Sequence, residues 1–536
     1  MLKNLIIAPL AMFLVASAVQ AAAPTPLLLQ VTLSTHAPAA ESGRLLVFAQ
    51  RWDEAVAAND GQPPTMVDTD ESKSLSVAVA AQETSRIAPG ETQWIDADQL
   101  AFPTPFSSLK PGAYAVQVVL DVHHDYNYVG RAPEDAISPV IKLEIGTGGA
   151  SPALVLTPGH PDDRVALDPP SNASSDQRAA YAAARHQIDP LDFVSPSLSA
   201  FWGQSIHMRG WVLRPPGYDP AGHARYPVVY LTPGFGGRWS TLVERAVRFH
   251  QEMAAGQSPP MIYVLLDESS ATGAHEFADS VNNGPWGQAL TAELIPALEQ
   301  RYRMDARRSG RLLTGHSSGG WATLWLQTRY PKLFGGTWST APDPSDFHDF
   351  LGIDLYVRDA NVYRRPDGTP YPVVRDKGQV LMTYEQFAKL ERVMGSYGGQ
   401  IASFEWVFSP KRADGRPVPM FDRATGAIDP DVAAYWRDNF DIAWRLAHHW
   451  PALKTDLEGK IHVIVGSVDT YYLDGSVRRL KAVLDGLGAK SQVTFIEGRT
   501  HNDLNRIGDD PYGLEKQIAW AMWAVARPDG PLKPKP

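Results

Sequence analysis

Residues 311–324 have the sequence RLLTGHSSGGWATL. An apolar segment leads into a glycine-rich turn, and a second apolar segment with helical spacing begins at Trp321. The turn has the pattern Gly-x-Ser-x-Gly, with Ser317 at its centre between Gly315 and Gly319. A serine at the apex of a sharp strand-to-helix turn leaves its neighbours almost no room, and glycine has no Cβ to clash. The pattern therefore predicts a strand, a tight turn carrying an exposed serine, and a helix.

Such a turn is the nucleophile elbow of the α/β-hydrolase fold. Ser317 would precede the helix directly, so the N–H of Ser318 has no partner within the helix and points to where an oxyanion would form. A helical pattern over 287–299 ends shortly before the strand, so helix, strand, turn and helix follow in the order of that fold. A plain glycine-rich loop would not explain this order. We therefore predict Ser317 as a nucleophile and Ser318 as an oxyanion donor.

The first 21 residues resemble a secretory signal peptide. Lys3 precedes an apolar run from Leu5 to Val19, and small residues surround a cleavage point near Ala21. The run is shorter than the ~20 residues of a spanning helix, and no later segment is apolar enough to span, so we expect no membrane span. The chain has no cysteine, and export without disulfides suits the bacterial periplasm. Its net charge of -10 offers no basic surface for nucleic acid.

A chain of 536 residues is too long for one ordinary core, so several domains are expected. Residues 25–146 contain short alternating segments with turns between them, which predict an N-terminal β-sandwich domain. Residues 147–195 are rich in Gly, Pro, Asp, Ser and Ala and are expected to be a linker. Residues 196–530 then form the catalytic domain. The expected sandwich strands are 27–33, 44–49, 74–79, 113–122 and 140–145.

A second glycine-rich loop precedes the elbow. Residues 227–237, PVVYLTPGFGG, combine an apolar strand with such a loop, at the place where this fold carries its other oxyanion donor. We expect that donor to be the backbone N–H of Phe235, with Gly234 as the alternative.

Four segments together resemble one family of α/β-hydrolases, the esterase D or enterochelin esterase-like family: PPGYD at 215–219, YPVVYL at 226–231, ELIP at 293–296 and GHSSGG at 315–320. The family includes feruloyl and acetyl-xylan esterases, siderophore esterases, S-formylglutathione hydrolases and mycolyltransferases. The resemblance covers about residues 206–341, resumes near Lys460, and implies an esterase. Two positions depart from the family: Pro233 stands where histidine is usual, and Ser318 where methionine is frequent.

A serine nucleophile needs a base, and the base needs a carboxylate that holds its tautomer. In this fold the chain order is serine, acid, histidine. An apolar strand at 461–465 ends in GSVD, which places Asp469 just beyond its carboxyl end. His501 follows the next strand and is the only histidine after His462. In the family, the corresponding turn and loop carry the acid and the base, so the resemblance also implies Asp469 and His501.

Two other carboxylates remain as alternatives for the acid. Asp474 is expected to cap a helix that starts near Gly475. Asp343 follows the strand ending near Thr340, from which some hydrolases take their acid. His316, next to the nucleophile, is expected to point away from the site and to have a packing or hydrogen-bonding role.

An insertion at about 344–458 is far longer than a simple crossover needs. Helical patterns cover 384–394 and 432–449, and aromatic residues are frequent. Ligands of open α/β folds bind at the carboxyl edge of the sheet, so this insertion is a candidate cap over the pocket. Most of its aromatic side chains are expected to form its own core. Trp286 and Asp346 are further candidates for substrate binding by position.

These patterns predict an exported serine esterase that cleaves a small-molecule or carbohydrate-linked ester through an acyl-enzyme on Ser317. No metal-ligand spacing is present, since His123-His124-Asp125 suits a polar strand end, so we expect no metal and no cofactor. One alternative is acyl transfer to an alcohol, as in mycolyltransferases. The other is a non-catalytic protein that binds carbohydrate or a partner on a hydrolase scaffold. Nothing in the sequence indicates an oligomeric state.

Overall fold

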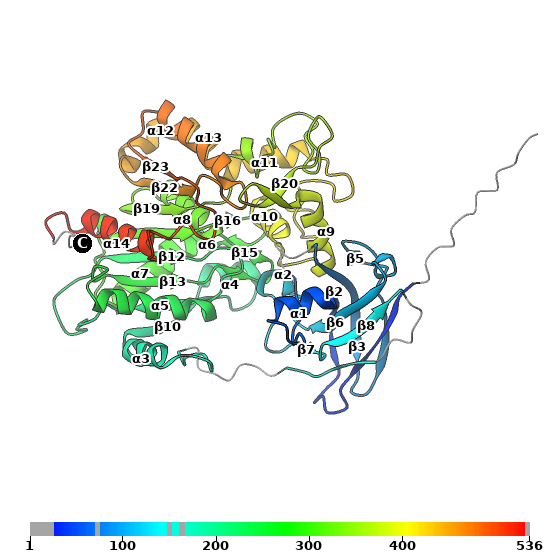
Figure 1. The fold of residues 1–536 in the computed structure, drawn as a ribbon. Coiled ribbons are helices and arrows are strands. Elements are labelled where there is room, and N and C mark those ends of the chain that lie inside the picture. The colour runs from blue at the N-terminus through cyan, green and yellow to red at the C-terminus, as the bar shows by residue number, and fades with distance from the viewer. Residues whose placement is uncertain (1–25, 70–74, 147–152, 160–166, 531–536) are drawn as a thin grey trace, which may run out of the picture.

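A computed structural model describes residues 26–69, 75–146, 153–159 and 167–530. The expected signal peptide at 1–21 lies outside these residues. An N-terminal β-domain lies at one end of the molecule and an α/β domain at the other (Figure 1). This arrangement confirms the predicted fold class. No helix in the described ranges is both long and apolar enough to cross a membrane.

The N-terminal β-domain consists of two packed sheets. One has the order β4-β1-β9, and the other has the order β5-β3-β2-β6-β7, with β8 also paired to β6. Alternate residues of β2 face opposite ways: Leu45 and Val47 pack between the two sheets, whereas Leu46 and Phe48 join the core shared with the rest of the molecule. The larger sheet is therefore buried on both faces. The strands are β1 (Leu28–Leu33), β2 (Glu41–Arg51), β3 (Val77–Ile87), β4 (Thr92–Asp96), β5 (Ala101–Phe102), β6 (Gly112–Asp121), β7 (Ala136–Ile137), β8 (Ile141–Ile145) and β9 (Leu154–Leu156).

The catalytic domain is built on an eight-stranded sheet of order β10-β11-β13-β12-β18-β19-β22-β23. The strands β10 and β11 pair antiparallel, as do β11 and β13, and the remaining neighbours are parallel. The loops that follow the parallel strands therefore meet at one edge of the sheet, where the site is built. The strands are β10 (Ile188–Val194), β11 (His207–Leu213), β12 (Val228–Thr232), β13 (Ile262–Leu266), β18 (Arg311–His316), β19 (Gly336–Thr340), β22 (Ile461–Gly466) and β23 (Gln492–Ile496).

Helices cover this sheet and join its strands. The helices of the catalytic domain are α3 (Ser175–Ala184), α4 (Pro196–Trp202), α5 (Trp239–Ala254), α6 (Trp286–Gln288), α7 (Ile295–Arg301), α8 (Ser318–Arg329), α13 (Leu473–Gly486) and α14 (Gly513–Ala526). Two elements fall within the segment expected to be a linker: α3 packs against α5, and β10 pairs along its whole length with β11. The catalytic fold thus begins before residue 196. The strand β10 has the sequence IDPLDFV, in which Pro190 interrupts the apolar pattern, and pairing with β11 orders it.

The insertion is mainly helical, and its last helix packs against α8 and α13 of the catalytic domain. It contains α9 (Tyr384–Met394), α10 (Gln400–Phe408), α11 (Pro430–Phe440), α12 (Ile442–Leu457) and a small hairpin of β20 (Pro372–Asp376) and β21 (Gln379–Thr383). The helical pattern over 432–449 is two helices rather than one. Asp441, with an extended backbone, ends α11, and its side chain accepts a hydrogen bond from the N–H of Trp444 to cap α12.

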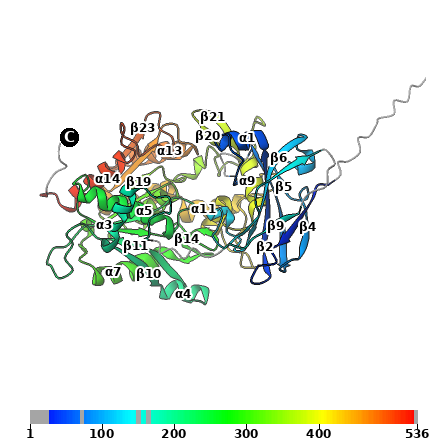
Figure 2. The ribbon, with the colours of Figure 1, turned by 60° about the horizontal axis from the view of Figure 1, so that its bottom comes forward.

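Aromatic side chains form much of the core of the insertion. The ring of Phe408 contacts the rings of Phe404, Trp436 and Phe440. Helix α9 contacts β3 and β5 of the β-domain, and Figures 1 and 2 show it between the two parts of the molecule. The insertion therefore joins the β-domain to the catalytic domain.

Candidate active site

Ser317 lies between the end of β18 and the first residue of α8. Its backbone has φ 58° and ψ -125°, a conformation that non-glycine residues rarely adopt and that marks functional turns. A Cβ on Gly315 would lie 2.1 Å from the carbonyl oxygen of Gly319, and one on Gly319 would lie 2.1 Å from that of Pro233. Only glycine fits on either side of this serine.

His501 and Asp469 come from the loops after β23 and β22, two neighbouring parallel strands. His501 Nδ1 lies 2.8 Å from Asp469 Oδ2, and Asp469 is completely buried. The other oxygen of Asp469 accepts hydrogen bonds from the N–H groups of Tyr471 and Leu473. With Nδ1 on the carboxylate, Nε2 is the ring nitrogen through which the imidazole can accept a proton. His501 lines the same cavity as Ser317.

The two alternative acids have other partners. Asp474 pairs with Arg375 at 2.8 Å in the first turn of α13. Asp343 accepts hydrogen bonds from Ser318 Oγ at 2.6 Å and from Ser317 Oγ at 3.4 Å. Burial raises the pKa of Asp343 to about 6. The carboxylate on His501 is thus Asp469, whereas Asp343 contacts the serines of the elbow, a role that no local pattern indicated.

His316 differs from expectation in one respect. We expected it to point away from the site, but its ring lines the cavity, 4.4 Å from the ring of His501. Its Nδ1 forms a hydrogen bond of 3.1 Å with Thr340 Oγ1. Burial, and then the neighbouring His501, lower the pKa of His316 well below its usual value. A neutral imidazole at this position packs against the base without adding charge.

The loop after β12 passes beside the nucleophile. A Cβ on Gly234 would lie 3.0 Å from Ser317 Cβ and 3.2 Å from the carbonyl oxygen of His316. The backbone N–H of Phe235 donates to no acceptor among the residues that the structure describes. Ser318 follows Ser317 directly at the start of α8, and Gly234, the neighbour of Phe235 in the chain, lies against Ser317.

The cavity around Ser317 has a volume of about 670 Å³ and walls from three parts of the molecule. The insertion supplies mainly apolar side chains, which include Phe387, Leu390, Ile401 and Phe404. The β-domain supplies a wall that the sequence did not predict, made of Met66, Asp68, Thr69, Tyr126, Asn127 and Gly130. The charged side chains among the described lining residues are carboxylates, Asp68, Asp343 and Glu391, with no lysine or arginine.

Gly234 was expected to bind substrate in addition to its place as the alternative donor, and of the three expected substrate-binding residues, Gly234, Trp286 and Asp346, the structure brings one to the cavity. Gly234 lines it, whereas Trp286 and Asp346 are not among its described lining residues. The ring of Trp286 is buried and stacks on His275 at 3.6 Å between centroids. Asp346 caps the short helix Phe347–Asp349. Both side chains serve packing or capping, so we do not include them among the substrate-binding residues proposed below.

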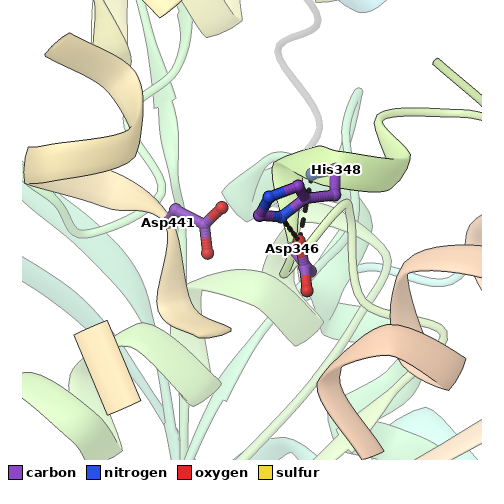
Figure 3. A group of neighbouring side chains, drawn as sticks. All are labelled: Asp346, His348 and Asp441. Atoms are coloured by element: carbon purple, nitrogen blue, oxygen red, sulfur yellow. Dashed lines mark hydrogen bonds and ion pairs between the residues drawn. The ribbon is translucent and has the colours of Figure 1, made fainter. Parts of the chain in front are cut away.

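Asp346 also belongs to the group of side chains with metal-ligand character shown in Figure 3, together with His348 and Asp441. Their ligand atoms lie within 4.8 Å of one another. Asp346 Oδ1 already accepts hydrogen bonds from the backbone N–H of His348 and pairs with His348 Nδ1. Asp441 accepts from two backbone N–H groups and from the hydroxyl of Tyr356. These contacts account for the carboxylates as helix caps, and we propose no metal here.

Comparisons with known proteins support the same chemistry. The family model described as "Putative esterase" matches residues 199–473, just over half of the chain. No curated protein matches the chain by sequence.

The solved structures that resemble part of this chain include a ferulic acid esterase, with 14% identity over 63% of this chain and 97% of that chain and a TM-score of 0.38. A second is the fluorophosphonate-binding serine hydrolase F of Staphylococcus aureus, with 12% identity over 63% of this chain and 98% of that chain and a TM-score of 0.37. A third is an S-formylglutathione hydrolase from Agrobacterium tumefaciens, with 15% identity over 64% of this chain and 95% of that chain and a TM-score of 0.36. Likeness at this level indicates nothing about substrate. The family match assigns the activity: the chain belongs to this esterase family of α/β-hydrolases and is a carboxylic ester hydrolase.

Proposed function

We propose that the protein is an exported serine esterase that cleaves its ester through an acyl-enzyme on Ser317. One observation carries the proposal: the buried hydrogen bond of 2.8 Å between His501 Nδ1 and Asp469 Oδ2, in the cavity that also holds the elbow serine. A buried carboxylate fixes the imidazole tautomer and stabilises the imidazolium that forms during the reaction. Export is proposed from residues 1–21 alone, whose pattern is that of a signal peptide.

The reaction follows from these positions. Ser317 Oγ attacks the ester carbonyl carbon while His501 Nε2 takes its proton, and the tetrahedral oxyanion is held by the N–H groups of Ser318 and Phe235. As the C–O bond breaks, His501 returns the proton to the leaving alcohol. Water then attacks the acyl-enzyme by the same route and releases the acid and Ser317.

The cavity also limits the kind of substrate. Its described walls combine apolar side chains of the insertion with three carboxyl groups and contain no lysine or arginine. Burial raises the pKa of Asp343 to about 6 and that of Glu391 to about 7, and Asp68 pairs with Arg131. Above about pH 6 an anionic substrate would therefore meet the ionised Asp343 and no basic side chain of the described lining, which is costly in a partly desolvated space. We therefore propose an ester whose buried part is apolar or aromatic and carries no negative charge. A neutral carbohydrate-linked ester fits this description, and an acidic small-molecule ester does not.

Labelling with a fluorophosphonate tests the proposal. The wild type is expected to label and to hydrolyse a short-chain aryl ester. Ser317→Ala is expected to lose both, and His501→Ala and Asp469→Asn to suppress both. Ser476→Ala is a matched control, because Ser476 is a buried serine of α13 whose hydroxyl bonds only locally, and it is expected to label like the wild type. A folded wild type that does not label would contradict the proposal and favour a non-catalytic binding protein. Adding alcohol acceptors and analysing the products separates hydrolysis from acyl transfer.

A further inference from the structure

A short helix of the N-terminal β-domain reaches into the catalytic centre. Helix α2 (Tyr126–Val129) follows the central strand β6. Its residues Tyr126 and Asn127, with the following Gly130, line the cavity that contains Ser317 and His501. The β-domain therefore does not sit apart from the active site as a separate binding module would. It forms part of the cavity wall.

Tyr128, the residue after Asn127 in α2, contacts the loop 234–237, called the oxyanion loop below, at two points. Its ring meets the ring of Phe235 edge-on, with centroids 4.9 Å apart. Its hydroxyl donates a hydrogen bond of 2.9 Å to the carbonyl oxygen of Gly237. Tyr128 is only 6% exposed, so both contacts are shielded from water. One side chain of the β-domain thus holds the loop at both ends of the segment 235–237.

A hydrogen bond of 3.0 Å from the N–H of Gly237 to the carbonyl oxygen of Gly234 gives the loop the shape of a turn, but few side chains hold this turn in place. Three of its four residues, Gly234, Gly236 and Gly237, have no side chain. Gly236 also has φ 80°. Glycine adopts this conformation at little cost, but its backbone is equally free to adopt others. Phe235 is therefore the one residue of 234–237 whose side chain can anchor the loop, and its ring packs against Tyr128.

The same turn also fixes the cap helix α9. Asn127 Nδ2 donates to the carbonyl oxygens of Glu391 and Gly395, each at 3.0 Å. From β2, Arg44 donates to the carbonyl oxygens of Arg392 and Val393. The last carbonyls of a helix have no partner within it, so donors from elsewhere fix its end. Helix α9 lines the opposite wall through Phe387 and Leu390.

We propose that the β-domain is an integral part of the catalytic centre, in which Tyr128 is a positioning residue that holds the N–H of Phe235 in place for the oxyanion. The inference rests on the proposed function. Oxyanion donors stabilise the transition state only when they are already placed close to where the charge develops, and a loop free to move loses that advantage. The ring contact sets the position of Phe235, and the Tyr128 hydroxyl holds the carbonyl of Gly237 at the end of a turn that is itself closed by the hydrogen bond from the N–H of Gly237 to the carbonyl oxygen of Gly234.

The test compares Tyr128→Phe and Tyr128→Ala with the wild type by kcat and KM for a small aryl ester. Tyr128→Phe keeps the ring contact and loses one hydrogen bond, so kcat is expected to fall about fivefold. Tyr128→Ala also loses the ring contact, and kcat is expected to fall about 100-fold, as when one oxyanion donor is lost. KM is expected to stay within about twofold, because the ester is bound by other walls. Affinity for an arylboronic acid, which mimics the tetrahedral intermediate, should fall in parallel with kcat/KM.

Tyr114→Phe is the matched control. Tyr114 is a buried tyrosine of the same domain, 5% exposed, and its hydroxyl also donates 2.9 Å to a backbone carbonyl, that of Lys110. Its kcat should equal that of the wild type. Wild-type kcat in both Tyr128 variants would overturn the inference. So would a loss of kcat that is matched in Tyr114→Phe, because it would reflect general stability. If Ser317→Ala still hydrolyses the ester, the proposed function fails instead, which is a different result.

Discussion

Replacing Asp343 by asparagine is expected to make the protein more stable at neutral pH and to leave it active. Asp343 is buried at the wall of the cavity, and burial raises the pKa of its carboxyl from 3.8 to about 6. Its described hydrogen-bond donors are the hydroxyls of Ser317 and Ser318. The amide oxygen of asparagine can accept from Ser318 in the same way.

The magnitude follows from the difference between the two pKa values. Below pH 3.8 the carboxyl is protonated in the folded and the unfolded chain, so its ionisation does not lower the stability of the wild type relative to the variant. Between 3.8 and about 6 only the unfolded chain ionises, and the stability of the wild type falls as the pH rises. Above that range the loss is complete and amounts to about 3 kcal/mol. Asparagine does not titrate, so the variant should gain up to this amount.

The assay is the difference in Tm between Asp343→Asn and the wild type, measured from about pH 4 to 8. The difference should rise with pH and then level off above about pH 6 to 7. Asp305→Asn is a control of opposite sign. Although burial acts to raise it, hydrogen bonds and charges from Arg307 and Arg527 lower the pKa of Asp305 to about 2. This variant should be less stable than the wild type above about pH 4 and should approach it in acid.

The kcat of Asp343→Asn tests whether Asp343 acts on the serines of the elbow and not on His501. Because Asp469 is the carboxylate on His501, Asp343→Asn should keep kcat within about tenfold of the wild type. A Tm difference that does not change with pH would refute the argument from burial. A loss of kcat as large as that of Asp469→Asn would show that Asp343 acts on the base.

Two further predictions concern the base and the elbow. Asp469→Asn should lower kcat by about 10³- to 10⁴-fold, because asparagine favours the wrong imidazole tautomer. Asp474→Asn, which removes a partner of Arg375, should change kcat by less than about threefold in the same aryl-ester assay. Equal losses in the two variants would show that Asp469 is not the acid. Gly319→Ala places a Cβ 2.1 Å from a backbone oxygen and should abolish either the expression of folded protein or its activity. Gly486→Ala, whose Cβ would meet nothing within 4 Å, should give folded protein with wild-type activity. A folded and active Gly319→Ala would contradict the elbow geometry.

The elbow and the fold class could be predicted from the sequence because their causes are local. The two glycines beside Ser317 are required by clashes with backbone only a few residues away or in the adjacent loop. The helices and strands around them follow from apolar spacing within single segments. The strand β10 and the break between α11 and α12 were missed for the opposite reason. The first is ordered by pairing with β11, and the second depends on the single side chain of Asp441.

The choice between Asp469 and Asp343 shows where local reasoning ends. Asp469 and Asp343 follow β22 and β19, which are neighbours in the sheet, so chain order places both carboxylates near the nucleophile. Only the packed structure shows that one lies on His501 and the other on the serine hydroxyls.

The sequence by itself determined the nucleophile, its glycine neighbours, the order of the catalytic residues and the division into a β-rich and an α/β part. The tertiary structure decided between the predicted Asp469 and its two alternatives as the carboxylate on His501, and it alone shows that Tyr128 reaches the loop 234–237 across a separation of 109 residues. The physical reason is the distance along the chain over which each kind of interaction acts. Steric limits and unpaired backbone groups act within a few residues and leave a pattern in the sequence, whereas contacts between domains depend on how two finished surfaces pack and leave none.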